Sequence, residues 1–404
     1  MIAIFTSLTV SNPLIKMIQR VLLSVFLLTS YCSHAQALEK YPLAEMLTIS
    51  SKVLHEQRKI AVYTPADYDI TSDQYPVIYL LDGEHNLLYT AGIISYLQKN
   101  QFMPKAIIVA INNVDRVRDF TPVPSKELYG LPQMGGADNF LRFIAEELKG
   151  EIAKRYRIAP YSILIGHSYG GIFSIYSQQV KPQLFNAYIT ISPSLFYDER
   201  ALIKSAKQYF LQEKSVTPQF MYMTVADEYP EFKQSIEAYV KVLKESAPES
   251  FSWHYQELPQ ETHMSSFHLA MFEGLKLLFK GWYLSDVAQL LEHGKFEDIK
   301  VYYQKLSEKF GYRIDVPSET VTAAGYYFIA NKRIDEAIEI FKKQVNKYPL
   351  TGGVYFNLSQ AYKANKQSDL AKEFVSKACE IGTQYQDLGT PMYCNVAKRM
   401  RQNH

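Results

Sequence analysis

A serine between two glycines is the first pattern in this sequence whose residue types could do chemistry. Residues 161–174 read YSILIGHSYGGIFS, in which the motif GHSYG at 166–170 separates two apolar runs. Glycines two residues before and after a serine, between a strand and a helix, are typical of a nucleophile elbow. A side chain at either glycine would collide with the adjoining strand or helix. The pattern predicts Ser168 as a nucleophile; the alternative is a glycine-rich turn with a bystander serine.

A base for Ser168 should follow it in the chain, because folds with this elbow carry serine, acid and histidine in that order. His254 lies within a predicted strand and His268 within a predicted helix, so both are expected to be ordinary histidines. His263 lies in the loop 259–266 between the last strand and the last helix. That loop is at the same sheet edge as Ser168, and we therefore predict His263 as the base.

The acid of such a site should come directly after the predicted strand 220–225. Asp227 and Glu228 both stand there, and Glu231 is a more distant third candidate. A carboxylate at this place would hold the imidazole in the useful tautomer and stabilise the imidazolium. The sequence does not separate the two neighbouring acids.

An oxyanion hole is expected near Ser168, between the start of the helix behind it and the loop after the predicted strand 77–81. The backbone N–H of Tyr169 would be one donor, and the N–H of Gly83 or Glu84, after the predicted strand 77–81, would be the other. The side chains of Glu84 and His85 are predicted to line the pocket.

A long polar loop at 115–136 is predicted to shape the substrate pocket, since loops of this length are often functional. Its Arg116 and Arg118 are candidate contacts to an anionic group. Surface positions, or a salt bridge to Asp119, are an equally good interpretation. We find no metal-ligand spacing, P-loop or dinucleotide fingerprint, and the predicted hydrolysis needs neither metal nor cofactor.

Strand-like and helix-like segments alternate through the first two thirds of the chain. This order predicts an α/β fold with a mostly parallel sheet and helices on both faces. Ligands in such sheets bind at the carboxyl ends of the strands, where Ser168 and His263 are predicted to lie. The predicted strands are 58–64, 77–81, 106–111, 161–165, 187–191, 220–225 and 252–258. The predicted helices are 90–100, 139–156, the helix after the elbow to about residue 180, 231–245 and 266–279.

The length of 404 residues predicts two domains, which we place at 38–281 and 282–404. Hydrophobic residues make up 47% and charged residues 21%, an ordinary globular composition. A formal net charge of +2, with no cluster of lysine and arginine, predicts neither a nucleic-acid nor a polyanion partner.

Residues 1–37 are predicted to be a signal peptide, with Met17 as an alternative start. A basic residue precedes the apolar run 21–29, and Ala-Gln-Ala at 35–37 is a cleavage signal. The mature protein would then be periplasmic or secreted, with no membrane span. A lipoprotein anchored through Cys32 and an uncleaved anchor are the alternatives.

Signal cleavage would leave two cysteines, Cys379 and Cys394, in an oxidising compartment. The sequence leaves open whether they form a disulfide, which would be structural rather than catalytic.

The region after residue 282 predicts a helical repeat. Small and aromatic residues recur there at the 34-residue spacing of a tetratricopeptide unit, and 294–306 resembles half of a third unit. The alternative is plain helical hairpins with no binding role. The first set is Gly325, Phe328, Ala337, Phe341 and Pro349, and the second set is Ser359, Tyr362, Ala371 and Val375.

Five segments together resemble the esterase D and enterobactin-esterase-like branch of the α/β-hydrolases. They are YPVIYLLDGEHNL, AINNVDRVRDFTP, ILIGHSYGGIFSIY, ISPSLFY and the later ETHMSS, spread over about 50–282. The resemblance implies an α/β-hydrolase fold and a serine esterase with Ser168 as nucleophile and His263 as base. It also implies backbone donors near Gly83 and Tyr169. The turn at 226–228 stands where members carry Gly-Asn-Glu, which favours Glu228.

These patterns predict a serine carboxylesterase that forms an acyl-enzyme on a siderophore-type or other small ester. A second hypothesis is a catalytically weak hydrolase scaffold whose helical repeats bind a protein partner. A third is acyl transfer to an acceptor other than water.

Overall fold

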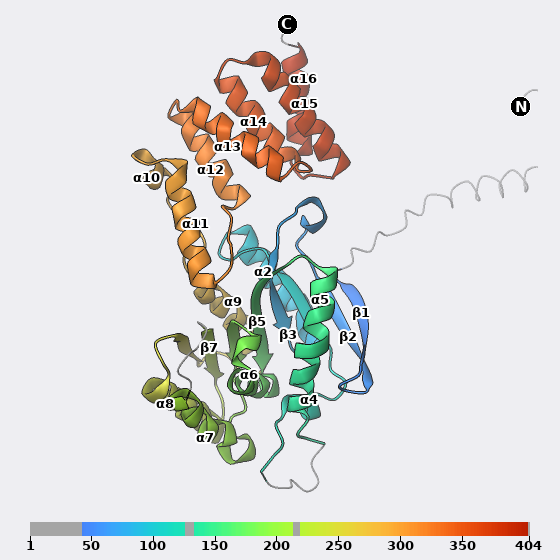
Figure 1. Ribbon diagram of the computed structural model, residues 1–404, viewed down its shortest axis with the longest axis vertical. Helices are drawn as coiled ribbons and strands as arrows, with labels where there is room; N and C mark the ends of the chain where they lie inside the picture. Colours follow the sequence, from blue (N-terminus) through green and yellow to red (C-terminus); the bar gives the residue numbers. More distant parts are fainter. Residues whose placement is uncertain (1–42, 126–132, 213–218, 403–404) are drawn as a thin grey trace, which may run out of the picture. The chain divides into compact units, whose positions relative to one another are not determined.

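The computed structural model describes residues 43–125, 133–212 and 219–402 of the chain. The predicted signal peptide, the alternative start Met17 and Cys32 lie outside the described residues. From Ala44 onward the chain is one compact unit, which contains a β-sheet with helices on both faces and a helical region after it (Figure 1).

An eight-stranded sheet forms the centre of the α/β part, with the strand order β1-β2-β4-β3-β5-β6-β7-β8. β1 and β2 pair antiparallel, β2 pairs antiparallel with β4, and the other neighbours are parallel. The predicted mostly parallel sheet is therefore confirmed. The strands are β1 (Glu45–Ser51), β2 (Glu56–Tyr63), β3 (Tyr75–Leu80), β4 (Ile107–Ile111), β5 (Ile158–His167), β6 (Ala187–Ile191), β7 (Gln219–Ala226) and β8 (Phe251–Leu258).

The register of the parallel strands brings several strand ends to one edge. Leu80 at the end of β3 pairs with Ile165 in β5, and His167 at the end of β5 pairs with Ile191 at the end of β6. The turns that follow these three strands must therefore meet at the carboxyl edge of the sheet. Ser168 directly follows β5 and so lies at the centre of that edge.

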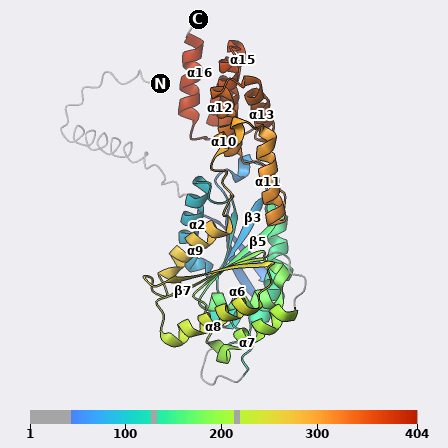
Figure 2. The same cartoon turned by 90° about the vertical axis from the view of Figure 1, so that its left-hand side faces the viewer.

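Alternating side chains of the central strands pack against two different sets of helices. Ile78, Ile108 and Ile165 face α2 (Gly83–Lys99) and α9 (Ser266–Leu278), which lie next to each other in Figure 2. Tyr79, Val109 and Leu164 face the other set. That set is α4 (Ala137–Arg142), the π-helical segment η3 (Phe143–Leu148), α5 (Lys149–Arg155), α6 (Tyr169–Val180), α7 (Tyr197–Gln212) and α8 (Pro230–Ser246).

The helical region consists of antiparallel hairpins at a regular offset. Ser318 and Gly352, the first residues of α12 and α14, are 34 residues apart, and so are Ile334 and Ser368, the first residues of α13 and α15. A helical region is thus present, while its assignment to the tetratricopeptide class stays a prediction. Its helices are α10 (Val287–Glu292), α11 (Phe296–Phe310), α12 (Ser318–Ala330), α13 (Ile334–Lys347), α14 (Gly352–Ala364), α15 (Ser368–Gln384) and α16 (Thr390–Gln402).

The residues that define the predicted repeat are buried where the helices cross. A Cβ atom on Gly325 would lie 2.1 Å from the ring of Phe341, so only glycine allows α12 and α13 to approach this closely. Phe328, Ala337 and Phe341 are fully buried, and Ala371 and Val375 occupy the same buried places in the next hairpin.

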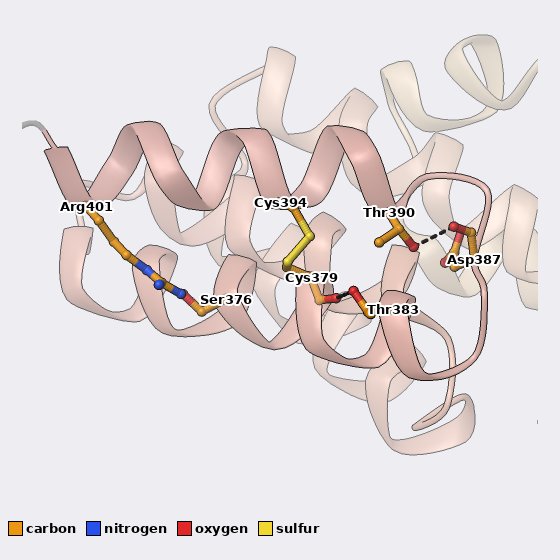
Figure 3. The surroundings of a disulfide bond; sticks show 7 residues. All are labelled: Ser376, Cys379, Thr383, Asp387, Thr390, Cys394 and Arg401. Atoms are coloured by element: carbon orange, nitrogen blue, oxygen red, sulfur yellow. Dashed lines mark hydrogen bonds between the residues drawn. A yellow bond between two sulfur atoms is a disulfide. The ribbon is translucent and has the colours of Figure 1, made fainter. Parts of the chain in front are cut away.

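A disulfide joins Cys379 in α15 to Cys394 in α16 (Figure 3). It settles the pairing that the sequence left open. The Asp387 carbonyl accepts a hydrogen bond from the Thr390 hydroxyl at 2.5 Å at the turn between the same two helices. The last helix is therefore tied to α15 and the preceding turn within its first five residues.

The helical region shares its core with the sheet. Tyr161 of β5 packs edge-to-face on Phe310 of α11 at 5.4 Å, and Phe279 lies 5.5 Å from the same ring. Two ion pairs also bridge the regions, Lys105 with Glu319 at 3.6 Å and Lys347 with Asp73 at 3.3 Å.

A cavity of about 550 Å³ lies between these ion pairs, and Tyr75, Pro76 and Tyr303 are among its lining residues. Since Tyr75 begins β3, the cavity is at the amino edge of the sheet, opposite to Ser168.

Several elements were not predicted from the sequence. β1 and α7 were absent from the prediction, and the long loop after β4 contains a short helix, α3 (Arg116–Phe120). The carboxylate of Asp115 caps this helix by accepting a hydrogen bond from the Arg118 amide at 3.0 Å. Residues 126–132 of that loop lie outside the described residues.

Candidate active site

Ser168 occupies the strained turn that a nucleophile elbow requires. Its backbone has φ 59° and ψ −114°, between the end of β5 and the start of α6. A Cβ atom on Gly166 would lie 2.2 Å from the carbonyl oxygen of Gly170, so glycine is obligatory at position 166.

Gly170, the second glycine of the motif, has room for a side chain, contrary to the expectation from sequence. A Cβ atom on Gly170 would lie 3.4 Å from its nearest neighbour, a methyl group of Leu81, which is ordinary van der Waals contact. The tight position is Gly171, where a Cβ atom would lie 2.8 Å from Pro193. The expectation that both glycines of the motif are sterically required is therefore wrong for the second, because the chain that follows β6 packs against Gly171 instead.

Hydrogen bonds tie the elbow to the turn after β6. The Ser168 amide donates to the Ile191 carbonyl at 3.0 Å, and the Ser194 amide donates to the Ser168 carbonyl at 3.3 Å. The hydroxyl of Ser168 lies 3.2 Å from Oγ of Ser194, which is buried. Sequence reasoning missed Ser194, although it stands two residues beyond Ser192 at the end of β6.

His263 and Glu228 are brought together by the loops after β8 and β7. Nδ1 of His263 lies 2.6 Å from Oε1 of Glu228, whose side chain is 5% exposed. Asp227 is exposed, and its amide donates to the Glu261 carbonyl at 2.8 Å. The geometry thus separates the two acids that the sequence left as alternatives: Glu228 contacts the imidazole, and Asp227 faces solvent.

The other two histidines considered as bases lie away from this pair. His254 is in β8 and stacks on Tyr222 at 5.9 Å. His268 is in α9, beyond the loop that carries His263.

Gly83 and Tyr169 are the first residues of α2 and α6, two helices that start from the adjacent parallel strands β3 and β5. The first N–H groups of a helix have no partner within it and point along the positive end of its dipole. A Cβ atom on Gly83 would lie 2.7 Å from the Ala110 carbonyl carbon, so this turn packs directly on β4. Both predicted backbone donors therefore lie at the carboxyl edge.

The side chains of Glu84 and His85 are placed differently from each other. Glu84 accepts hydrogen bonds from the amide and the Nδ2 of Asn113, at 3.1 and 2.8 Å. His85 is 77% exposed and lies 3.8 Å from Glu84. Glu84 thus fixes the turn after β4, while His85 is open to solvent.

Arg116 is held by backbone and side-chain groups of the site. Its Nε and Nη2 donate to the two oxygens of Asp82 at 2.6 and 2.9 Å, and Nη2 also lies 3.2 Å from the His167 carbonyl oxygen. The guanidinium lies over the rings of Phe120 and Tyr169. Arg116 therefore has three acceptors within the protein.

Arg118 takes part in a second charge cluster. It pairs with Asp119 at 2.7 Å and with Glu56 at 2.8 Å, and the fully buried Arg58 pairs with the same two acids. The interpretation of Arg118 as half of a salt bridge to Asp119 agrees with this arrangement.

Aromatic rings surround the imidazole of His263. Phe232 meets it edge-on at 5.3 Å, and His167 lies 4.5 Å away. Phe232 in turn contacts Phe196 and Tyr229, and the Tyr229 side chain is more than half exposed. Aromatic side chains therefore line one side of the imidazole, and Tyr229 is the most exposed of them.

The described residues contain no group of three or more histidine, cysteine or acidic side chains arranged to hold a metal ion. No helix among them combines the length and the hydropathy that a membrane crossing needs.

The fold and the elbow define the class: the described chain is an α/β-hydrolase followed by a helical region. Residues 51–249 match the model of the Esterase family. The solved IroE-like serine hydrolase from Shewanella oneidensis aligns with a TM-score of 0.66 and 25% identity, over 74% of this chain and 97% of that one.

A second solved structure is similar over more of the chain. An uncharacterised protein from Capnocytophaga ochracea aligns with a TM-score of 0.60 and 18% identity, over 89% of this chain and all of that one. At this identity the likeness concerns the fold alone.

Among curated proteins, the ferri-bacillibactin esterase BesA of Bacillus subtilis is 33% identical over 153 residues, which are 33% of this chain and 53% of BesA. The siderophore enterobactin esterase of Emericella nidulans is 27% identical over 165 residues, 35% of this chain and 53% of that protein. The chain spans about half the length of these relatives.

Proposed function

We propose that this protein is a serine carboxylesterase. Ser168 attacks the ester carbonyl, His263 accepts the serine proton and returns it to the leaving alcohol, and water then hydrolyses the acyl-enzyme. The backbone N–H groups of Gly83 and Tyr169 stabilise the oxyanion. No metal or cofactor enters these steps.

The observation that carries the proposal is the contact between His263 and Glu228, at the same edge as the elbow. With Nδ1 engaged by the carboxylate, Nε2 is the nitrogen left for the proton of Ser168. In the described residues the Ser168 hydroxyl contacts the Ser194 hydroxyl, and no hydrogen bond joins it to His263. Such bonds often tighten only when a substrate is bound.

For the substrate we propose a siderophore-type or other small carboxylic ester. The support is the similarity to three curated siderophore esterases, from Bacillus subtilis, Emericella nidulans and Aspergillus fumigatus. Arg116 and Arg118, which the sequence suggested as contacts to an anionic group, are both engaged in ion pairs within the protein. We therefore propose that apolar contacts to the substrate come from the aromatic side chains beside His263, of which Tyr229 is the most exposed.

The test compares the full chain with Ser168→Ala on p-nitrophenyl acetate, on longer acyl esters and on an iron-free and an iron-loaded siderophore ester. We expect kcat/KM to fall at least about 1,000-fold in the variant. A fluorophosphonate probe should label the native protein at Ser168 and leave the variant unlabelled. Wild-type hydrolysis by Ser168→Ala would contradict the proposal, and product analysis with an added alcohol separates hydrolysis from acyl transfer.

We propose a periplasmic or secreted location. The signal-like sequence before residue 38 supports it, and a disulfide between Cys379 and Cys394 suits an oxidising compartment. Fractionation of cells that express the full chain, with N-terminal sequencing of the product, tests this. A cytoplasmic, unprocessed product would contradict it.

A second candidate function is partner binding by the helical region. The observation that favours it is the 34-residue offset of the two hairpins, the period of tetratricopeptide arrays that bind peptides. If the hydrolase part is only a scaffold, the fluorophosphonate probe will leave Ser168 unlabelled. Crosslinking with full-length Ser168→Ala in the native extract should then still capture a defined partner.

A further inference from the structure

His167, the residue directly before the nucleophile, is not used by the proposed chemistry, yet its side chain is buried within the site. Its Nε2 lies 2.8 Å from the backbone carbonyl oxygen of His263. A carbonyl oxygen only accepts hydrogen bonds, so Nε2 of His167 carries a proton and donates. Burial, reinforced by the neighbouring His263, lowers the pKa of His167 to about 4, and the ring is therefore neutral near pH 7.

This hydrogen bond fixes the loop that carries the base. The His263 carbonyl also accepts a hydrogen bond from the Ser266 hydroxyl at 3.0 Å, so two donors hold the same peptide group. The ring of His167 packs on the ring of His263, with centroids 4.5 Å apart. Both the backbone and the imidazole of His263 are thus in contact with the residue next to Ser168.

Arg116 contacts the backbone of His167. Nη2 of Arg116 donates to the His167 carbonyl, and the same guanidinium binds both oxygens of Asp82. Asp82 is the residue before Gly83, and His167 is the residue before Ser168. One guanidinium therefore connects the turns that supply the two oxyanion donors.

We infer that His167 and Arg116 are positioning residues, which hold the loop of His263, the elbow and the turn at Gly83 in a fixed mutual arrangement. The inference rests on the proposed esterase function for its effect on rate. On this inference Arg116 holds Asp82 and the His167 carbonyl, rather than binding an anionic group of the substrate.

The central experiment compares three variants of His167 in the full chain. In His167→Gln the amide nitrogen takes about the place of Nε2 and can still donate to the His263 carbonyl. His167→Asn has the same chemistry but is too short, and His167→Phe keeps the ring without a donor. We expect kcat to fall about 10- to 100-fold in the Asn and Phe variants, with KM nearly unchanged and kcat largely retained in His167→Gln.

Arg116→Lys keeps the positive charge but loses the two-point contact with Asp82. A positioning role predicts a lower kcat at an unchanged KM, whereas contact with an anionic substrate predicts a higher KM at an unchanged kcat. Both residues act on the same arrangement of loops. The fold-loss of kcat in the double variant Arg116→Lys, His167→Asn should therefore be smaller than the product of the two single fold-losses. Unchanged kcat in His167→Asn, or equal losses in the Asn and Gln variants, would overturn the inference.

A readout without substrate separates this inference from the esterase proposal. The proton on Nδ1 of His263, shared with Glu228, gives a downfield NMR resonance that reports the position of the imidazole. We expect His167→Gln to retain this resonance and His167→Asn to shift or broaden it, with both variants folded by thermal unfolding. If the wild type cleaves no ester but the resonance follows this pattern, only the proposed function fails. If the wild type is active and the resonance is the same in both variants, only the positioning role fails.

Discussion

The imidazole of His263 and the carboxylate of Glu228 meet at 2.6 Å, although 35 residues separate them in the chain. They stand on the loops after β8 and β7, two neighbouring parallel strands, so the sheet places these two loops side by side. The neighbouring Asp227 comes from the same turn but faces solvent.

Glu228→Gln should lower kcat at least about 100-fold, because an amide can no longer stabilise the imidazolium that forms during attack. The matched control is Asp227→Asn, which removes a charge one residue away and should change kcat less than about twofold. Initial rates on p-nitrophenyl acetate measure both. Equal losses in the two variants would show that the acid assignment is wrong.

Gly166→Ala should destabilise the fold by more than about 2 kcal/mol, since its Cβ would overlap the Gly170 carbonyl. Gly170→Ala, at the other glycine of the motif, should change the free energy of unfolding by less than about 1 kcal/mol because its Cβ meets only ordinary contacts. Urea denaturation followed by circular dichroism compares them. A larger loss in Gly170→Ala than in Gly166→Ala would contradict the packing described for the elbow.

The free energy of unfolding should fall as the pH drops from about 6.5 to about 4. Folding lowers the pKa of His167 to about 4 from an ordinary 6.5, so below pH 6.5 the unfolded chain binds a proton that the folded chain does not. Protonation linked to His167 should lower the free energy of unfolding by about 3 kcal/mol over that pH window and should have no effect above about pH 6.5. Denaturant titrations at several pH values measure the slope. His167→Gln should show a shallower slope, and an unchanged slope would exclude His167 as its source.

Breaking the disulfide between Cys379 and Cys394 should cost about 3 kcal/mol of stability, the loop-closure value for about 15 residues. Ester hydrolysis at 25 °C should stay unchanged, because the bond joins α15 to α16 and touches no residue of the site. Thermal unfolding of Cys379→Ser, Cys394→Ser and the double variant, with and without reductant, tests this. The three should behave alike, and additive losses would mean that the thiols act separately.

The parts of the fold predicted from sequence are those with strong local signals. The apolar run 187–191 is β6 to the residue, and the elbow motif located the passage from β5 to α6, although β5 is longer at both ends than the predicted strand 161–165. β1 was missed because it is an edge strand with mostly exposed side chains. α7 was missed because it is polar and because Asp198, Glu199 and Arg200 interrupt its first turn with left-handed backbone angles.

Chain order was enough to single out Ser168 and His263, since each follows a recognisable strand, but it left Asp227 and Glu228 as alternatives. It could not reveal that Arg116 binds Asp82, because a charged residue in a loop has the same sequence signature whether its partner is a substrate or a carboxylate 34 residues away. The contact of His167 with the His263 carbonyl likewise depends on two loops that meet only after the sheet has formed. Such contacts are set by tertiary packing rather than by local pattern.

The packing of Phe310 on Tyr161 and Phe279 affects which truncations of this protein can be tolerated. A premature stop codon or frameshift after codon 281 would leave Ser168, Glu228 and His263 encoded, yet it would remove Phe310, whose ring packs on Tyr161 of β5, the strand that leads to Ser168. The exposed rings would favour aggregation of the truncated product. Truncating mutations in the last third of the gene should therefore be lost from populations although they spare the nucleophile.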